Sequence, residues 1–154
     1  MDIPLKIQLP IQLKKIDDFC IVRFQDKTLQ NPDLHWYVLI PAGLSHFLIA
    51  MITSHGVKRA KYYRGTPQAK AVGSLVRINN NDFGFLKRDS VIECNYTEYL
   101  DIQEIIHRIE EEKGFKIEKE KVPAYLKKKI VSAINNSPLV SPLIRKLAIA
   151  ANPI

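Results

Sequence analysis

The sequence has few cysteines and no arrangement of them that predicts a metal or redox site. Cys20 and Cys94 are its only two cysteines among 154 residues, and they are far apart. Both lie in apolar, strand-like stretches, so we interpret them as buried free thiols, which are typical of a reducing environment. The acidic residues and histidines also lack the close spacing of metal ligands. The sequence therefore predicts no metal site and no cofactor.

Long apolar runs and glycine-rich loops are missing as well. No stretch approaches the roughly 18 apolar residues that a membrane-spanning helix needs, so we expect no membrane partner. Residues 1–5 have no charged region followed by an apolar segment, so no secretory signal is expected. The six glycines do not form a phosphate-binding loop. These absences favour a soluble, cytoplasmic protein.

Basic residues outnumber acidic ones, and the excess is local. The formal net charge is +7 at pH 7. Between residues 55 and 89, eight lysines and arginines face only Asp82 and Asp89. This imbalance favours a polyanionic partner, although charge alone does not identify a nucleic acid.

Short apolar runs bounded by turn residues predict antiparallel strands. The clearest runs are residues 19–24, 36–40, 47–52, 75–78 and 90–93. Their close spacing favours a small, curled antiparallel sheet or barrel over a helical domain. Residues 1–16 alternate between apolar and polar, but Pro4 and Pro10 restrict them to an edge strand or an extended arm. Residues 25–33 and 55–70 are expected to be exposed loops, the second one basic.

The apolar period changes after Asp101. Isoleucines at 102, 105, 106 and 109 have the spacing of an amphipathic helix, and Gly114 is placed as its stop. Val122-Pro123 opens a second helix and Ser141-Pro142 a third. The predicted fold is mainly β with α: an antiparallel barrel domain over residues 1–114, including the first helix, and a C-terminal helical extension over 115–154.

Several short motifs occur in an order that resembles the MazF/PemK-like toxins, which are sequence-cleaving ribonucleases. They are residues 36–40, Ile52-Thr53-Ser54, residues 86–91 and Tyr99-Leu100-Asp101. Order and spacing agree over roughly residues 19–110. The resemblance implies an SH3-like barrel and metal-independent cleavage of single-stranded RNA. It also implies two partners, a second copy in a homodimer and a small antitoxin chain.

The resemblance and the chemistry of RNA cleavage together select four catalytic candidates, His35, Thr53, Ser54 and His55. Thr53 matches a threonine that is catalytic in the family. The family's arginine has no counterpart between Phe24 and His35, so His35 or a basic residue from elsewhere has to replace it. Imidazole suits proton transfer because its pKa is about 6.5. The same residues can instead be surface histidines and strand-ending hydroxyls.

The basic segment after these residues is the predicted RNA-binding surface, because aromatic faces stack on bases while cations follow phosphates. Its candidates are Lys58, Arg59, Lys61, Tyr62, Tyr63 and Arg64. The predicted function is a metal-independent endoribonuclease of the toxin–antitoxin type. The alternative is a non-catalytic SH3-like module that binds nucleic acid or a protein partner.

Overall fold

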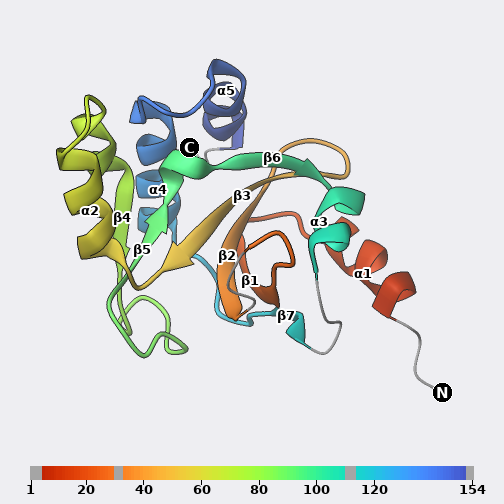
Figure 1. The fold of residues 1–154 in the computed structure, drawn as a ribbon. Helices are drawn as coiled ribbons and strands as arrows, with labels where there is room; N and C mark the ends of the chain where they lie inside the picture. Colours follow the sequence, from red (N-terminus) through yellow and green to blue (C-terminus); the bar gives the residue numbers. More distant parts are fainter. Residues whose placement is uncertain (1–4, 30–32, 110–113, 152–154) are drawn as a thin grey trace.

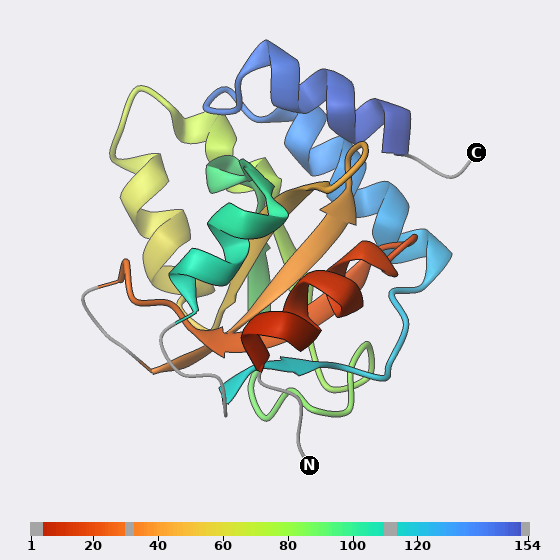
Figure 2. The ribbon, with the colours of Figure 1, turned by 90° about the vertical axis from the view of Figure 1, so that its right-hand side faces the viewer.

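A computed structural model describes residues 5–29, 33–109 and 114–151, which form a seven-stranded antiparallel sheet with helices on both faces (Figures 1 and 2). The strands are β1 (Cys20–Gln25), β2 (Leu34–Pro41), β3 (His46–Thr53), β4 (Leu75–Ile78), β5 (Ser90–Glu93), β6 (Glu98–Asp101) and β7 (Lys116–Ile117). The helices are α1 (Leu5–Lys14), α2 (Gly56–Arg64), α3 (Ile102–Arg108), α4 (Ala124–Asn136) and α5 (Pro142–Ala151). Two 3-10 turns are also present: η1 (Ala69–Ser74) lies between α2 and β4, and η2 (Cys94–Tyr96) lies between β5 and β6.

The five strands predicted from apolar runs are all present, and they pair in the order β4-β5-β3-β2-β1-β7. The chain from β5 through η2 to β6 runs along the other edge of β3. There β5 pairs with residues 52–53 and β6 with residues 46–49. The described sheet ends at β4 on one side and at the short β7 on the other. It is therefore a mixed α/β fold with an antiparallel sheet, and the predicted closure into a barrel is not found.

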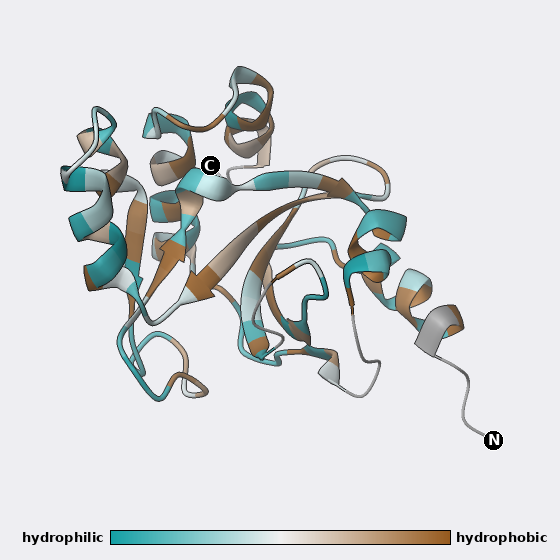
Figure 3. Ribbon diagram, in the orientation of Figure 1, coloured by the Kyte–Doolittle hydropathy of each residue, from teal (hydrophilic) through white to brown (hydrophobic). Residues whose placement is uncertain are grey.

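Each face of the sheet has its own apolar core. Val38 and Ile40 of β2 belong to the core that α4 and α5 cover, whereas Tyr37 and Leu39 belong to the core that α1 and α3 cover. Because β2 is buried on both faces, its sequence is a continuous apolar run instead of an alternating one. Figure 3 shows the apolar strands of the sheet, whereas α2 is largely hydrophilic.

The prediction of an edge strand or extended arm over residues 1–16 is wrong for the part that the structure describes, because residues 5–14 form α1. Leu9 and Leu13 are buried, whereas Ile7 and Ile11 are exposed. Apolar residues at every second position also place residues i and i+4 on one helical face. The same pattern therefore fits a helix. Pro10 lies inside it and removes one backbone donor.

The prediction of a loop over residues 55–70 is also wrong. Residues 56–64 form α2, and η1 begins at residue 69. A Cβ atom on Gly56 would lie 2.7 Å from a methyl group of Val91, so glycine allows α2 to begin against β5. The other predicted loop holds a fully buried residue, Asp26, although an exposed segment was expected. Residues 30–32 of that loop lie outside the described residues.

The three C-terminal helices occur where the sequence predicts them, although α3 ends at Arg108, before the expected stop at Gly114. Leu126, Ile130 and Ile134 of α4 are buried in the same core as the strands. The segment after residue 114 also supplies β7, which pairs with β1. The residues after 114 therefore join the same core and the same sheet as the residues before it. None of the helices in the described ranges is long and apolar enough to cross a membrane.

Candidate functional site

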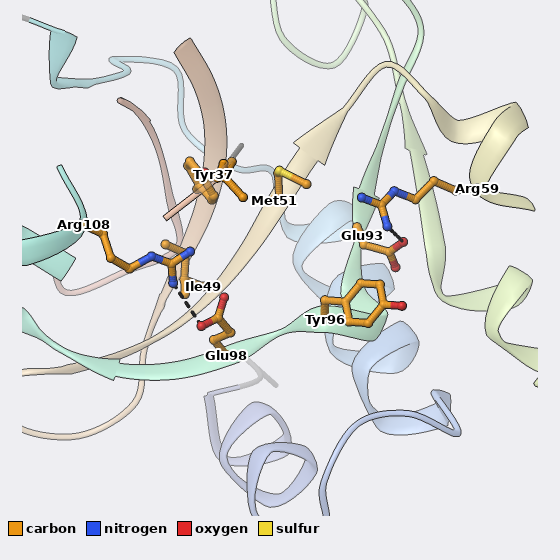
Figure 4. Close-up of a pocket in the computed structure, with 9 residues that line it drawn as sticks. Tyr37, Ile49, Met51, Arg59, Glu93, Tyr96, Glu98 and Arg108 are labelled. Carbon is orange, nitrogen blue, oxygen red and sulfur yellow. Dashed lines mark hydrogen bonds and ion pairs between the residues drawn. The ribbon is translucent and has the colours of Figure 1, made fainter. Parts of the chain in front are cut away.

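A cleft of about 400 Å³ lies over one face of the sheet, between α2 and α3 (Figure 4). It is lined by Leu29, Tyr37, Ile49, Met51, Arg59, Glu93, Tyr96, Glu98 and Arg108. Apolar side chains of β2 and β3 form its floor, and Tyr37 and Met51 lie directly opposite each other in the strand register. The charged residues come from the surrounding elements. The cleft therefore combines an apolar floor with a charged rim, as ligand sites commonly do.

The interruption between β5 and β6 places two carboxylates at this rim. Glu93 is the last residue of β5, Tyr96 belongs to η2, and Glu98 is the first residue of β6. The side chain of Glu93 accepts a hydrogen bond from the Asn95 backbone N–H, which caps η2. The local turn thus separates the two acids along β3 while both stay on the cleft side.

Glu93 is buried and fully engaged. Its Oε2 atom accepts a hydrogen bond of 2.9 Å from the Tyr63 hydroxyl and lies 3.5 Å from the Arg59 guanidinium. Its Oε1 atom accepts from the side-chain amide of Asn95 at 2.8 Å, and the Oδ1 atom of Asn95 accepts from the Ser137 hydroxyl at 2.7 Å. Glu93 is therefore an anchor for Arg59, since it has no free lone pair for a reacting proton.

Arg59 reaches into the cleft from α2 (Figure 4). Its side chain keeps 32% of its surface exposed, and its guanidinium lies over the Tyr96 ring at 5.7 Å from the centroid. The ion pair with Glu93 and the ring contact both orient the guanidinium. Arg59 thus presents a positioned positive charge to any ligand in the cleft.

Arg108 enters from the opposite side and is held by Asp26. The Nε and Nη2 atoms of Arg108 both donate to Asp26 Oδ2, at 3.0 and 2.5 Å. Asp26 is fully buried and also accepts from the Thr28 backbone N–H and hydroxyl and from the Tyr37 hydroxyl. This network fixes the direction of the guanidinium and leaves its Nη1 atom facing the cleft rim.

Three pKa values in this network are shifted. Burial would raise the pKa of Asp26, but the hydrogen bonds from Arg108 and Thr28 outweigh burial and lower it. Burial would lower the pKa of Arg108, but Asp26 and Glu98 raise it overall. Burial, followed by the charge of Asp26, raises the pKa of Tyr37. At neutral pH the pair is therefore ionised and Tyr37 is a neutral hydroxyl.

Glu98 is the accessible carboxylate of the cleft. Its side chain is 52% exposed, and its Oε2 atom accepts a hydrogen bond of 3.0 Å from Arg108 Nη1. Its Oε1 atom has no hydrogen-bond partner within the described residues. A carboxylate with one free oxygen beside the Arg108 guanidinium, in a cleft that Arg59 also lines, is suited to accept a proton near a bound phosphate.

The strand register brings two of the predicted catalytic residues to one end of the sheet. Trp36 pairs with Ile52 at the end of the register between β2 and β3, so His35 and Thr53 are the next residues at this end, and the alternation along each strand puts them on the face that carries the cleft. Neither residue lines the cleft itself. Thr53 is buried, and its hydroxyl accepts a hydrogen bond of 3.2 Å from the His55 backbone N–H. The Nε2 atom of His35 is buried without a hydrogen-bond partner in the part of the chain that the structure describes.

Ser54 and His55 follow Thr53 directly, but the cleft is not lined by either of them. Both are exposed, and Ser54 lines a second pocket of about 530 Å³ between α2 and the strands β4 and β5, together with Arg64. The four catalytic candidates thus do not surround one common pocket.

The predicted RNA-binding residues lie on α2 and face different ways. Lys58, Lys61 and Tyr62 are exposed, while Arg59 lies in the cleft. Tyr63 is only 1% exposed, and its hydroxyl is bonded to Glu93. A buried ring cannot stack on a base, so the prediction that Tyr63 contacts RNA is wrong.

Sequence reasoning missed the residues that shape the cleft. Asp26, Glu93, Glu98 and Arg108 have no motif spacing, because each is brought in by a different element. The one usable signal was the capping pattern at Asp101 and Glu104, which correctly starts α3 and thereby places Arg108 on a helix.

The fold and the site together define a mixed α/β protein whose antiparallel sheet carries an arginine- and carboxylate-lined cleft. No protein-family model matches the sequence, and no curated protein matches it either. Among the described residues, no three histidine, cysteine, aspartate or glutamate side chains gather in a way that would hold a metal ion.

Proposed function

We propose that this protein is a metal-independent endoribonuclease of the toxin–antitoxin type that cleaves single-stranded RNA in the cleft between α2 and α3. One observation carries the proposal: Arg59, Arg108 and the exposed carboxylate of Glu98 line a single cleft, in which Arg108 contacts Glu98 and Arg59 contacts Glu93. The net charge of +7 supports a polyanionic substrate.

In the proposed reaction, Glu98 accepts the proton of a ribose 2′-hydroxyl, and the 2′-oxygen attacks the adjacent phosphorus. The bond from phosphorus to the 5′-oxygen breaks, which leaves a 2′,3′-cyclic phosphate and a 5′-hydroxyl. Arg59 and Arg108 stabilise the negative charge that grows on the phosphoryl oxygens. The leaving 5′-oxygen takes its proton from a hydroxyl at the rim, for which Tyr96 is placed, since it is exposed and lines the cleft.

The proposal also answers the question left by the missing family arginine. Arg108 of α3 reaches Asp26, directly after β1, and so provides a guanidinium at the site from a distant part of the chain. The homodimer and the antitoxin chain that the MazF/PemK-like resemblance implies belong to this proposal. The catalytic roles predicted for His35 and Thr53 form an alternative site at the end of the sheet, because neither residue lines the cleft.

The test is an RNA cleavage assay in EDTA with a labelled single-stranded RNA. We expect cuts that end in a 2′,3′-cyclic phosphate, and the variants Glu98→Gln and Arg108→Lys should each lose about 100- to 10,000-fold in rate. Asp17→Asn, which makes the same charge change as Glu98→Gln at an exposed position, should retain full activity. Cleavage that survives both cleft variants but not His35→Ala or Thr53→Ala would move the active site to the end of the sheet.

A second function, a non-catalytic RNA-binding module, is favoured by one observation of its own. The exposed side chains of Lys58 and Lys61 on α2 lie outside the cleft, so they can hold RNA without any chemistry. The same assay, with binding measured as well as cleavage, distinguishes the two functions. Binding without any cleavage product, together with a loss of binding in Lys58→Gln/Lys61→Gln, would select the module over the nuclease.

A further inference from the structure

A shallow groove of about 480 Å³ runs between α4 and the sheet edge formed by η1 and β4, away from the cleft. Its polar lining residues are Arg77, Lys128, Lys129, Ser132 and Asn136. Its apolar contributors include Val76 and Ala133, which are buried and therefore offer little surface. The accessible part of the groove is thus cationic and hydrogen-bonding.

The periodicity of α4 produces this lining. Lys128, Ser132 and Asn136 are four residues apart and share one helical face, while Ile130 and Ile134 point into the core. Arg77 projects from β4, the edge strand of the sheet. In Figure 1, α4 lies beside β4, so the two elements form the walls of the groove.

The cations of the groove have no acidic partner. No aspartate or glutamate lines it, and neither Arg77 nor Lys128 makes an ion pair with any described residue. Lys129 lies over the Tyr125 ring, 5.8 Å from its centroid, which leaves its charge uncompensated. The neighbouring Lys127, by contrast, is bound to Asp18 at 2.7 Å. Three adjacent positive charges of this kind are stabilised by an external anion.

Arg77 connects the groove to a larger surface, because it also lines the second pocket beside Ser54 and Arg64. That pocket has about 530 Å³, which lies within the range of small-molecule sites and is sufficient for a nucleotide. A flexible polyanion that crosses β4 can therefore contact Lys128, Arg77 and Arg64 in turn, although Asp89 also lines the second pocket.

We propose that the groove between α4 and β4 binds the phosphates of single-stranded RNA at a site separate from the cleft. Nucleic-acid interfaces are more polar and more positively charged than protein interfaces, whose centres are apolar and depleted of charge. The groove is polar and positively charged, as nucleic-acid interfaces are. The inference rests on the proposed function only in the choice of RNA as the polyanion, since phosphate binding here requires no cleavage.

The experiment measures binding without chemistry. A fluorescent, cleavage-resistant 2′-O-methyl RNA of about 12 nucleotides is titrated with the full chain at several salt concentrations. The variant Lys128→Gln/Lys129→Gln is compared with Lys14→Gln/Lys15→Gln, which removes two exposed charges near α1 on the other face of the sheet. Circular dichroism checks that all variants are folded.

Each lost phosphate contact lowers the salt slope of log K by about 0.7, which corresponds to about fivefold in affinity at 0.1 M salt. The α4 variant should therefore bind about 25-fold more weakly with a slope reduced by about 1.4, and adding Arg77→Gln should weaken binding further. The control pair should change neither value. Equal binding by the α4 variant and the control would overturn the inference, as would a poly-glutamate competitor that displaces the RNA at equal charge concentration. Loss of cleavage activity alone would leave these binding results unchanged and would count only against the proposed nuclease.

Discussion

Arg108 and Asp26 are 82 positions apart in the chain, yet two guanidinium nitrogens of Arg108 donate to a single carboxylate oxygen of Asp26. The contact joins the end of α3 to the residue that follows β1. A backbone hydrogen bond of 2.9 Å from Lys27 to the Arg108 carbonyl reinforces the junction. This pairing closes one side of the cleft and directs the Nη1 atom of Arg108 toward Glu98.

Replacement of Asp26 should be costly. In Asp26→Ala the Arg108 guanidinium, the Thr28 groups and the Tyr37 hydroxyl lose a buried acceptor. Removing one partner of a buried ion pair costs about 3–5 kcal/mol, so the urea midpoint should fall markedly. Asp33→Ala, at an exposed position, serves as the control. An unchanged midpoint in Asp26→Ala would show that the network does not stabilise the fold.

The same carboxylate should make stability sensitive to acid. The pKa of Asp26 is lower in the folded protein than its unfolded value of about 3.9, so between these two values the unfolded chain binds more protons. The free energy of unfolding should therefore fall as the pH drops below about 4. Urea titrations across this range should give a flatter pH profile for Asp26→Asn than for the natural chain. Some acid sensitivity should persist, because the pKa of Asp18 is also lowered: burial raises it, but Lys127 outweighs burial.

The Tyr63 hydroxyl is predicted to orient Arg59 indirectly, through Glu93. It donates to Glu93 Oε2, the same oxygen that pairs with Arg59. Hydrogen bonds to charged groups contribute about 1.5–3 kcal/mol, so Tyr63→Phe should lower the free energy of unfolding by this amount. The neighbouring Tyr62 is exposed and Tyr62→Phe is the matched control. Equal stability of the two variants would mean that the hydrogen bond from Tyr63 to Glu93 does not stabilise the fold.

The two thiols are predicted to be unreactive in the folded protein. Burial, followed by the charge of Asp18, raises the pKa of Cys20 to about 12, and burial raises the pKa of Cys94 well above its ordinary value. Since the thiolate is the reactive form, a thiol reagent at about pH 8 should label neither residue until urea is added, after which both should react. Rapid labelling of Cys94 in native protein would contradict its burial.

Local signals in the sequence account for much of the fold. The strands are predictable because the centre of β2 and most of β3 are buried and so appear as uninterrupted apolar runs. The helices α3 and α5 begin at capping residues that can be recognised without tertiary information. By contrast, the apolar spacing of α1 suits a strand and a helix equally, and only the packing of Leu9 and Leu13 decides between them.

The candidate site was far less predictable for a physical reason. Its side chains meet through β-register and helix packing, and no local pattern links Arg59 to Glu93 or Asp26 to Arg108. The excess of basic residues in 55–89 correctly indicated a charged segment, but it could not show that Tyr63 faces inward and Arg59 faces the cleft. The histidines and the threonine-serine pair were selected from the family resemblance and from the chemistry of RNA cleavage, and neither of these reports on packing.

The turn that separates β5 from β6 has a structural consequence. Ser137, at the end of α4, holds Asn95; Asn95 holds Glu93; and Glu93 holds Arg59. This series of contacts runs from the end of α4 on one face of the sheet to the Arg59 guanidinium in the cleft on the other, so polar contacts as well as the apolar core join the two faces.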